Sequence, residues 1–361
     1  PRGRLPKPAQ QLRLCEWLQS EVIHSDAPDD PASSTYLILF RAPKLMVLAG
    51  HGRATLQASH AALCELTGLS PAQLSRDIVL RPALLLVGSE TLRERAAHIQ
   101  RRAGLDDAEL VKALSAAPRV LSSPTNSVDR RVDWLRDELG LSAGQLRRVV
   151  ANAPLVVMLS IANTLERRRA YLADELRLDE ERVRATIACS PSLLHSPVVD
   201  LQKKVAALTS SGAARSNEDA YRLVAALPSY FSLPANRARE RVRWLRDDLG
   251  VSAADAAEML RSEPAILEQA HAQLEIRARF YTDVLGADPA ALPSVPQLFT
   301  CDVNRVLLLR HAYCLASGLH ATPAELLTKG TAAFCRDVAK CTEGELRAFE
   351  ESGDHLKFFA A

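Results

Sequence analysis

Seven basic residues recur along the chain at intervals of 36, 37, 36, 37, 36 and 33 residues. This basic column consists of Arg95, Arg131, Arg168, Lys204, Arg241, Arg277 and Arg310. Only Lys204 has an acidic residue, Asp200, three or four positions away, so the other six have no partner for an ion pair within one helix. Guanidinium and ammonium groups without local acids can bind phosphate oxygens. The column therefore predicts a surface that binds a nucleic acid.

A structural role for the column is the alternative. The stem of an arginine can cover apolar surface, and its guanidinium can bond the carbonyl groups that end a neighbouring helix. The residue types in the column do not distinguish the two roles, so both stay open at this point.

More cations adjoin the column in several of its copies. We include Arg130, Arg167, Lys203, Arg239 and Arg243 in the predicted nucleic-acid-binding set and call them the flanking cations. Acidic pairs such as Asp137-Glu138 and Asp247-Asp248 lie farther along the same segments. Because the formal net charge is only +2, a phosphate partner would be met by a locally positive face and not by the whole surface.

Enzyme motifs are absent from the sequence. It contains no Gly-x-x-x-x-Gly-Lys-Ser/Thr loop, no Gly-x-Gly-x-x-Gly loop after a strand, no His-Glu-x-x-His and no Gly-x-Ser-x-Gly. The nine histidines are dispersed, and we interpret His98 and His311 as packing or solvated residues. We interpret Asp129 and Asp133 as helix-surface charge. The sequence thus predicts no catalytic residue, no metal site, no cofactor and no small-molecule substrate.

The seven cysteines are odd in number, widely scattered and contain no Cys-x-x-Cys pair. This distribution argues against a disulfide framework and favours a reducing compartment. No uninterrupted apolar run of about 18 residues occurs, so we expect no membrane partner.

The elements that must position the column are marked by a repeated proline. A proline followed by apolar residues occurs at eight positions: Pro43, Pro82, Pro118, Pro154, Pro191, Pro228, Pro264 and Pro296. The intervals are 39, 36, 36, 37, 37, 36 and 32 residues, and each column residue follows its proline by 13 or 14 positions. The chain is therefore an array of about eight repeats.

A glycine follows most of these prolines at an almost constant distance. The glycines are Gly68, Gly104, Gly140, Gly212, Gly250, Gly286 and Gly318. A glycine at a helix end can adopt the left-handed conformation at no steric cost. The fourth copy has Arg177 instead, so we expect an arginine to adopt the left-handed turn there.

The third copy shows how one repeat is built. Apolar residues spaced as on one helix face predict a helix near 126 to 138, which Gly140 ends. Ser142 and Gln145 form a capping box that begins a second helix, which runs to about Ala153 before Pro154 interrupts it. The same capping pattern occurs at Ser70, Asp106 and Thr322.

Each repeat is thus a longer helix, a glycine turn, a shorter helix and a proline-started apolar turn, and no segment alternates as a strand does. We predict an all-α solenoid with an N-terminal basic, Pro-rich tail and leading helix over 1–36, a repeat array over 37–330 and a C-terminal helical cap over 331–361. Trp134, Tyr171, Trp244 and Phe280 occupy matching positions and are predicted to pack between repeats.

The chain resembles the mitochondrial transcription termination factor (mTERF) family in three features. These are the proline that begins each repeat, the glycine that ends its first helix, and the segment Arg-Val-Asp-Trp-Leu-Arg-Asp-Glu-Leu-Gly-Leu-Ser at 131–142, which returns at 241–252 in nearly the same form. The resemblance covers about residues 40 to 330. It implies a crescent of helical triplets whose third member is a short 3₁₀ turn. It also implies binding to double-stranded DNA or structured RNA in mitochondria, with chloroplasts as the alternative organelle.

Three functions stay open at this stage. The first is binding of structured RNA, including ribosomal RNA, by a ribosome-associated architectural protein with protein neighbours at both tails. The second is sequence-specific binding of double-stranded DNA by a transcription factor, which usually requires more positive charge and base-reading side chains. The third is a protein-only scaffold in which the column faces inward. We favour the first because the net charge is modest.

Overall fold

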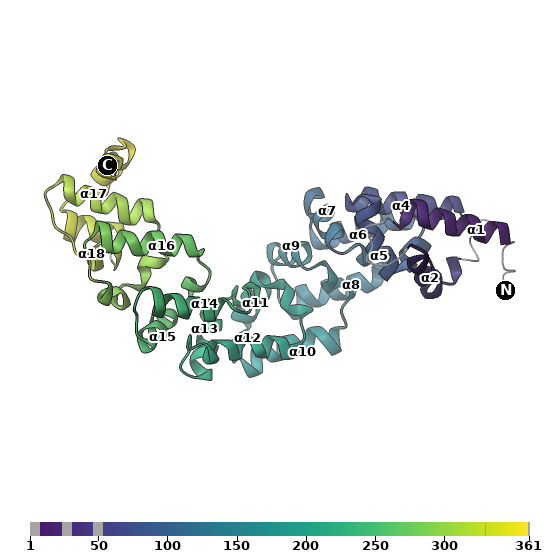
Figure 1. Ribbon diagram of the computed structural model, residues 1–361, viewed down its shortest axis with the longest axis horizontal. Coiled ribbons are helices and arrows are strands. Elements are labelled where there is room, and N and C mark those ends of the chain that lie inside the picture. Colours follow the sequence, from purple (N-terminus) through teal and green to yellow (C-terminus); the bar gives the residue numbers. More distant parts are fainter. Residues whose placement is uncertain (1–7, 24–30, 46–52, 329, 360–361) are drawn as a thin grey trace. The chain divides into compact units, whose positions relative to one another are not determined.

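The computed structural model describes residues 8–23, 31–45, 53–328 and 330–359. Most of these residues are helical and none is in a strand, which confirms the predicted all-α fold (Figure 1). The chain divides into two compact units, Pro1–Pro197 and Val198–Ala361, which we call unit 1 and unit 2. In Figure 1 the elements of each unit follow one another in chain order.

Unit 1 contains the leading helices and the first four repeats. The leading elements are α1 (Pro8–Trp17), the π turn η1 (Leu18–Val22) and α2 (Pro31–Arg41). The next elements are α4 (Arg53–Thr67), α5 (Pro71–Leu80), η2 (Pro82–Leu86), α6 (Ser89–Ala103), α7 (Asp107–Ala116), η3 (Pro118–Ser122), α8 (Thr125–Asp133), η4 (Trp134–Glu138), α9 (Ala143–Asn152) and η5 (Pro154–Met158). The unit ends with η6 (Ile161–Leu165), α10 (Glu166–Ala170), η7 (Tyr171–Glu175), α11 (Glu180–Cys189) and η8 (Pro191–Leu194).

Unit 2 continues the repeats. It begins with α12 (Val198–Ser210), α13 (Asn217–Ala226), η9 (Tyr230–Ser232), α14 (Arg237–Arg243), η10 (Trp244–Asp248), α15 (Ala253–Ser262), η11 (Pro264–Leu267), α16 (His271–Arg279) and η12 (Phe280–Val284). It then has η13 (Pro289–Ser294), η14 (Pro296–Phe299), η15 (Val303–Leu308), α17 (Leu309–Ala316), α18 (Pro323–Thr328), α19 (Thr331–Phe334), η16 (Cys335–Ala339), α20 (Glu343–Glu351) and η17 (Asp354–Phe359).

The repeated proline begins a short 3₁₀ helix. Five of these, η2, η3, η5, η8 and η11, start at the proline itself, as does η14 at Pro296. Proline fits this place because its ring sets φ for a helical first residue and the missing N–H group would have had no partner there. In the copy at Pro228 the 3₁₀ helix starts two residues later, at Tyr230. The first copy, at Pro43, runs on into residues 46–52, which lie outside the described residues.

Successive repeats stack as three rows. In unit 1 the first helices α4, α6 and α8 contact one another in order, the second helices α7, α9 and α11 do the same, and the 3₁₀ helices η2, η3 and η5 form the third row. The leading helix α2 packs on α5 and η2. A single repeat cannot bury its apolar face alone, so the core is the continuous contact between rows.

The predicted first helix of the third repeat is two elements. It is an α-helix up to Asp133 and a wide π turn from Trp134, where the Leu139 N–H donates to the Trp134 carbonyl at 2.9 Å. Equivalent wide turns begin at Tyr171, Trp244 and Phe280. The apolar spacing does not reveal this change, because only the hydrogen-bond partner differs. All four aromatic side chains are at most 6% exposed, which confirms their predicted place in the core.

The turn predictions are confirmed. All seven repeat glycines have positive φ, and Arg177 takes the same left-handed conformation with φ 55°. Capping boxes are formed at Ser70, Asp106 and Ser142, each with the residue three positions later. The Glu325 N–H likewise donates to Thr322 Oγ1. These turns and caps set where each first helix begins and ends, and thus where the column lies.

Candidate nucleic-acid interface

The seven column residues lie on the first helices and reach toward the following repeat. In six of them a side-chain nitrogen bonds a carbonyl in or just after the next 3₁₀ helix. The acceptors are Leu121 for Arg95, Leu159 for Arg131, Ser196 for Arg168, Phe231 and Leu233 for Lys204, Gln269 for Arg241 and Cys301 for Arg277. Arg310 bonds the Leu326 carbonyl. The donor–acceptor distances run from 2.6 to 3.2 Å.

This contact has a simple cause. The last carbonyl groups of any helix have no partner within the helix and form its negative end. A cation from the preceding repeat satisfies them: Arg168 donates through both Nε and Nη2 to Ser196, at 3.0 and 2.8 Å. Arg131 adds a second contact, from Nη1 to the Ser127 carbonyl at 2.9 Å. The column therefore joins each repeat to the next.

Burial of the column follows from this role. Arg241, Arg277 and Arg310 are 3%, 8% and 4% exposed, and the other four are half-buried. Burial lowers the pKa of Lys204 below its ordinary value. Burial, followed by the neighbouring charge of Arg130, lowers the pKa of Arg131. Burial and then Arg167 do the same for Arg168.

These contacts show what the column does within the protein, and binding of a nucleic acid by the column stays a prediction. Arg95, Arg131, Arg168, Lys204, Arg241, Arg277 and Arg310 all direct polar atoms at protein carbonyls. Their lack of acidic neighbours within the helix is real, but their partners are backbone groups about one repeat later. The contacts seen are those that a structural role requires.

The flanking cations have different surroundings. Arg130, Arg167, Arg239 and Arg243 are exposed, and within the described part of the chain none of the four lies in an ion pair or donates a side-chain hydrogen bond. Lys203 is also exposed but pairs with Asp200 at 3.3 Å. Four of the five flanking cations can therefore bind a phosphate group without breaking an existing contact within the protein.

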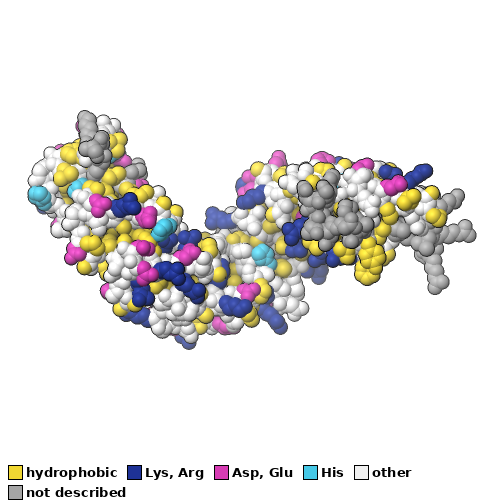
Figure 2. Space-filling model, in the orientation of Figure 1, with side chains coloured by type: hydrophobic (Ala, Val, Ile, Leu, Met, Phe, Trp, Pro, Cys, Tyr) yellow, Lys and Arg dark blue, Asp and Glu magenta, His cyan; other side chains and the backbone are white. Residues whose placement is uncertain are grey.

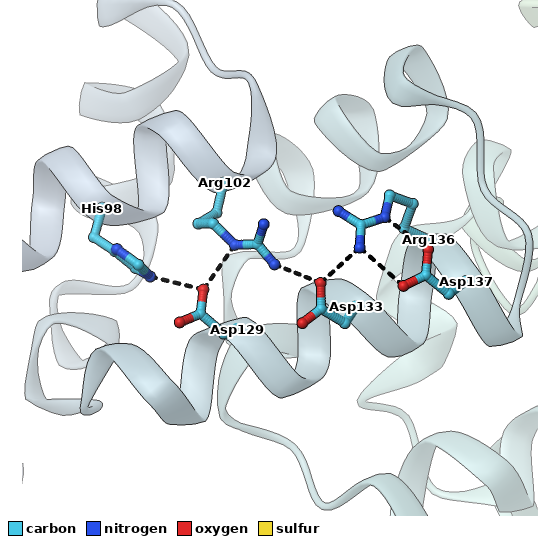
Figure 3. A network of polar contacts seen from close by, with 6 residues as sticks. All are labelled: His98, Arg102, Asp129, Asp133, Arg136 and Asp137. Carbon is cyan, nitrogen blue, oxygen red and sulfur yellow. Dashed lines mark hydrogen bonds and ion pairs between the residues drawn. The ribbon is translucent and has the colours of Figure 1, made fainter.

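Other surface arginines are already paired. Figure 3 shows a chain of charges that links α6 to α8, in which Arg102 Nε lies 2.7 Å from Asp129 and Arg102 Nη2 lies 2.5 Å from Asp133. His98 Nε2 lies 2.9 Å from Asp129, and Arg136 continues the chain from Asp133 to Asp137. The Arg136 hydrogen bond lowers the pKa of Asp137. The two carboxylates predicted as helix-surface charge therefore hold neighbouring repeats together.

Charge on the surface is mixed in sign. Figure 2 shows Lys and Arg side chains interspersed with Asp and Glu, and in unit 2 they are denser over the middle repeats than near α17 and the C-terminal end. No group of three or more His, Cys, Asp or Glu in the described residues could hold a metal ion. Within the same residues, no helix has the length and apolar character needed to cross a bilayer.

Comparison with known families decides the class of this protein. The mTERF family model matches residues 55–174 and 173–335. The chain belongs to the mTERF family. Members of this family bind nucleic acids in organelles and are not enzymes. A comparison with curated proteins finds no matching relative.

In this mTERF protein one further cation, Arg237, lies near the column beside Arg239 and Arg243. Arg237 lies one helical turn before Arg241, at the position that Ser127 occupies relative to Arg131. Its sequence signal is the alternation Arg-Ala-Arg-Glu-Arg-Val-Arg over residues 237–243, in which every second residue is basic. A helix places alternate residues on different faces, so this run covers several sides of α14 with positive charge.

Proposed function

We propose that this mTERF protein binds structured RNA in mitochondria, with ribosomal RNA as the first target to test and an architectural role beside ribosomal proteins. The observation that carries the proposal is the exposure of Arg130, Arg167, Arg239 and Arg243 without protein partners in the described residues. Exposed cations of this kind contact phosphates and position a nucleic acid without reading its sequence.

The balance of charge favours RNA over sequence-specific DNA. Each column residue donates to a carbonyl, so fewer of its N–H groups remain for phosphates. Sequence-specific duplex binding needs side chains that reach base edges in addition to a strongly positive surface. Structured RNA is recognised largely by shape and by contacts to phosphates and 2′-hydroxyl groups.

The two tails are the proposed contacts with neighbouring proteins. Of the N-terminal basic, Pro-rich segment 1–10, residues 1–7 lie outside the described residues and residues 8–10 begin α1. At the other end Leu356 and Phe358 are 57% and 43% exposed on η17. Exposed apolar side chains at a chain end suit a protein contact better than a nucleic-acid contact.

The test is crosslinking and sequencing of nucleic acid bound to the full chain in isolated mitochondria, together with sedimentation. Enrichment of ribosomal RNA and comigration with a ribosomal subunit would support the proposal. Enrichment of one DNA site would favour the transcription-factor alternative. Capture of neither nucleic acid would contradict RNA binding and favour a protein-only scaffold, and import into chloroplasts but not mitochondria would correct the organelle.

The salt dependence of RNA binding in vitro provides a second test. If each flanking cation neutralises one phosphate, the log–log slope of affinity against salt is about −3.5 to −4.5. Replacing Arg130 and Arg167 by Gln should reduce the slope by about 1.4 to 1.8. The matched control is Arg147→Gln, because Arg147 is exposed but already paired with Asp106 and Glu109 at 2.5 and 2.6 Å.

A further inference from the structure

We infer that a pocket beside α14 in unit 2 binds a single backbone phosphate of the RNA. This inference rests on the proposed function and adds a defined contact point to it. The pocket has a volume of 260 Å³ and is lined by Arg237, Arg241 and Arg243, with Trp244 and His271 as ring walls. At about 30 Å³ per water, this space holds a phosphate group with several waters.

Two of the arginines that line the pocket have a buried Nε without a partner in the described residues. Arg241 is 3% exposed, and its Nη2 donates to the Gln269 carbonyl at 2.7 Å, while its Nε has no partner in the described residues. The Nε of Arg237 is likewise buried without a partner. No acidic side chain of the described residues forms an ion pair with either guanidinium. A buried charge of this kind is costly until it is neutralised.

The pocket lining also has two acids, Glu240 and Asp248, against three arginines, so the acids offset its positive charge only in part. Glu240 accepts a hydrogen bond from Asn236 Nδ2 at 2.5 Å, and Asp248 lies at the far end of η10. His271 lies 3.4 Å from Glu275 on its own helix. The pocket therefore keeps an excess of positive charge, to which a phosphate is the natural complement.

The Nε of Arg277 is also buried without a partner in the described residues, but no other repeat has a second arginine four positions before its column residue. Four positions before the column residue, the carbonyls of Ser127, Thr164 and Gln273 accept a hydrogen bond from Arg131, Arg168 and Arg277. In the copy of Arg241 this position is occupied by a second arginine, Arg237. Arg237 and Arg241 therefore place two positive charges one helical turn apart in the wall of the pocket.

The electrostatics of Arg241 agree with a site for an anion. Burial, and then the charge of Arg237, lower the pKa of Arg241 to about 10, while the charge of Glu240 acts in the opposite direction. The guanidinium carbon of Arg241 also lies 5.9 Å from the centre of the Trp244 ring, an apolar wall that strengthens charge interactions nearby. A neighbouring pocket of unit 2 differs, because its Arg222 and Arg261 are paired with Asp219 and Glu258.

The first experiment measures thermal unfolding of the full chain in inorganic phosphate and in chloride at equal ionic strength. We expect phosphate to raise the Tm of the wild type, because a ligand that binds only the folded state stabilises it. Arg237→Gln should have a higher Tm than the wild type in chloride, since a like charge is removed, and should lose the phosphate effect. A lower Tm with an unchanged phosphate effect would overturn the pocket.

The second experiment measures RNA affinity against salt. Arg237→Gln should weaken binding about fivefold near physiological salt and reduce the log–log slope by about one. Arg237→Lys should restore most of the slope because it keeps the charge. The matched control is Arg246→Gln, an exposed arginine on η10 that does not line the pocket and should leave the slope unchanged.

The two experiments distinguish failure of the phosphate pocket from failure of the proposed RNA binding. RNA binding by the wild type with the same slope in Arg237→Gln overturns the pocket and leaves the proposed function standing. Stabilisation by inorganic phosphate without any RNA binding overturns both the proposed function and the RNA phosphate as ligand, and identifies a site for free phosphate.

Discussion

Arg167 and Arg168 are adjacent in the sequence and differ in what their side chains contact. Arg168 is half-buried and donates to the Ser196 carbonyl, whereas Arg167 is exposed and has no protein partner in the described residues. The difference arises because neighbouring positions on a helix point about 100° apart, so that only one of them reaches the next repeat. Residue type alone therefore does not distinguish an arginine that links two repeats from an arginine that is available to bind a ligand.

Arg168→Ala and Arg167→Ala should affect different properties, the first the stability of the protein and the second its affinity for RNA. Arg168→Ala should lower the free energy of unfolding by about 1–3 kcal/mol, because a charged hydrogen bond is lost and a carbonyl is left without a partner. Arg167→Ala should change it by less than about 0.5 kcal/mol and weaken RNA binding. Urea unfolding and fluorescence anisotropy measure the two effects. Loss of stability in Arg167→Ala with unchanged RNA affinity would reverse these roles.

At the scale of elements, the turn after the first helix shows how closely local sequence controls the repeat. Seven turns use glycine at positive φ, and the fourth copy places Arg177 there with φ 55°. A side chain in this conformation costs about 1–2 kcal/mol. The copy pays this cost because the neighbouring repeats hold the turn in place.

Arg177→Gly should therefore raise the free energy of unfolding by about 0.5–1 kcal/mol, since the strain is removed and part of the gain is offset by the more flexible unfolded chain. The reverse change in the preceding copy, Gly140→Ala, should lower it by a similar amount. Chemical denaturation of both variants checks the prediction, and stabilisation by Gly140→Ala would contradict it.

The charge chain between α6 and α8 makes a different prediction. Asp133 accepts from both Arg102 and Arg136, so Asp133→Asn should weaken the contact between the two repeats. Because these side chains are partly exposed, the loss should be about 1 kcal/mol or less at low ionic strength. It should shrink in 1 M salt, where the screening length is about 3 Å. A loss that is equal at both salt concentrations would show that packing, and not charge, is responsible.

At the scale of the whole molecule, buried thiols give unit 2 a sensitivity to alkaline pH. Burial raises the pKa of Cys301 and Cys314 from about 9 to about 11. Both lie in unit 2. A thiol whose pKa is raised on folding binds its proton more tightly in the folded state, so its contribution to stability is complete below pH 9 and is lost as the pH rises to about 11.

We therefore expect the stability of unit 2 to fall between pH 9 and 11 by about 1.4 kcal/mol per pH unit for each such thiol. Replacing Cys301 and Cys314 by Ala should flatten this dependence even if stability at pH 7 is lower. Trp244 is the tryptophan of unit 2, so its fluorescence in a Trp17→Phe, Trp134→Phe background reports on that unit. An unchanged slope in the Cys→Ala variant would contradict the prediction.

The sequence by itself determined the repeat, its turns and its caps, because these depend on residues a few positions apart: Pro154 starts a 3₁₀ helix, Gly140 ends a helix and Ser142 caps the next one. The same locality made the left-handed Arg177 predictable. Only the tertiary structure decided what the basic column does. Its partners are backbone carbonyls in the next repeat, and since every residue carries a carbonyl, no residue pattern marks which ones will be reached. The stacking of repeats turned Arg131 and Arg168 inward and left Arg130 and Arg167 facing outward.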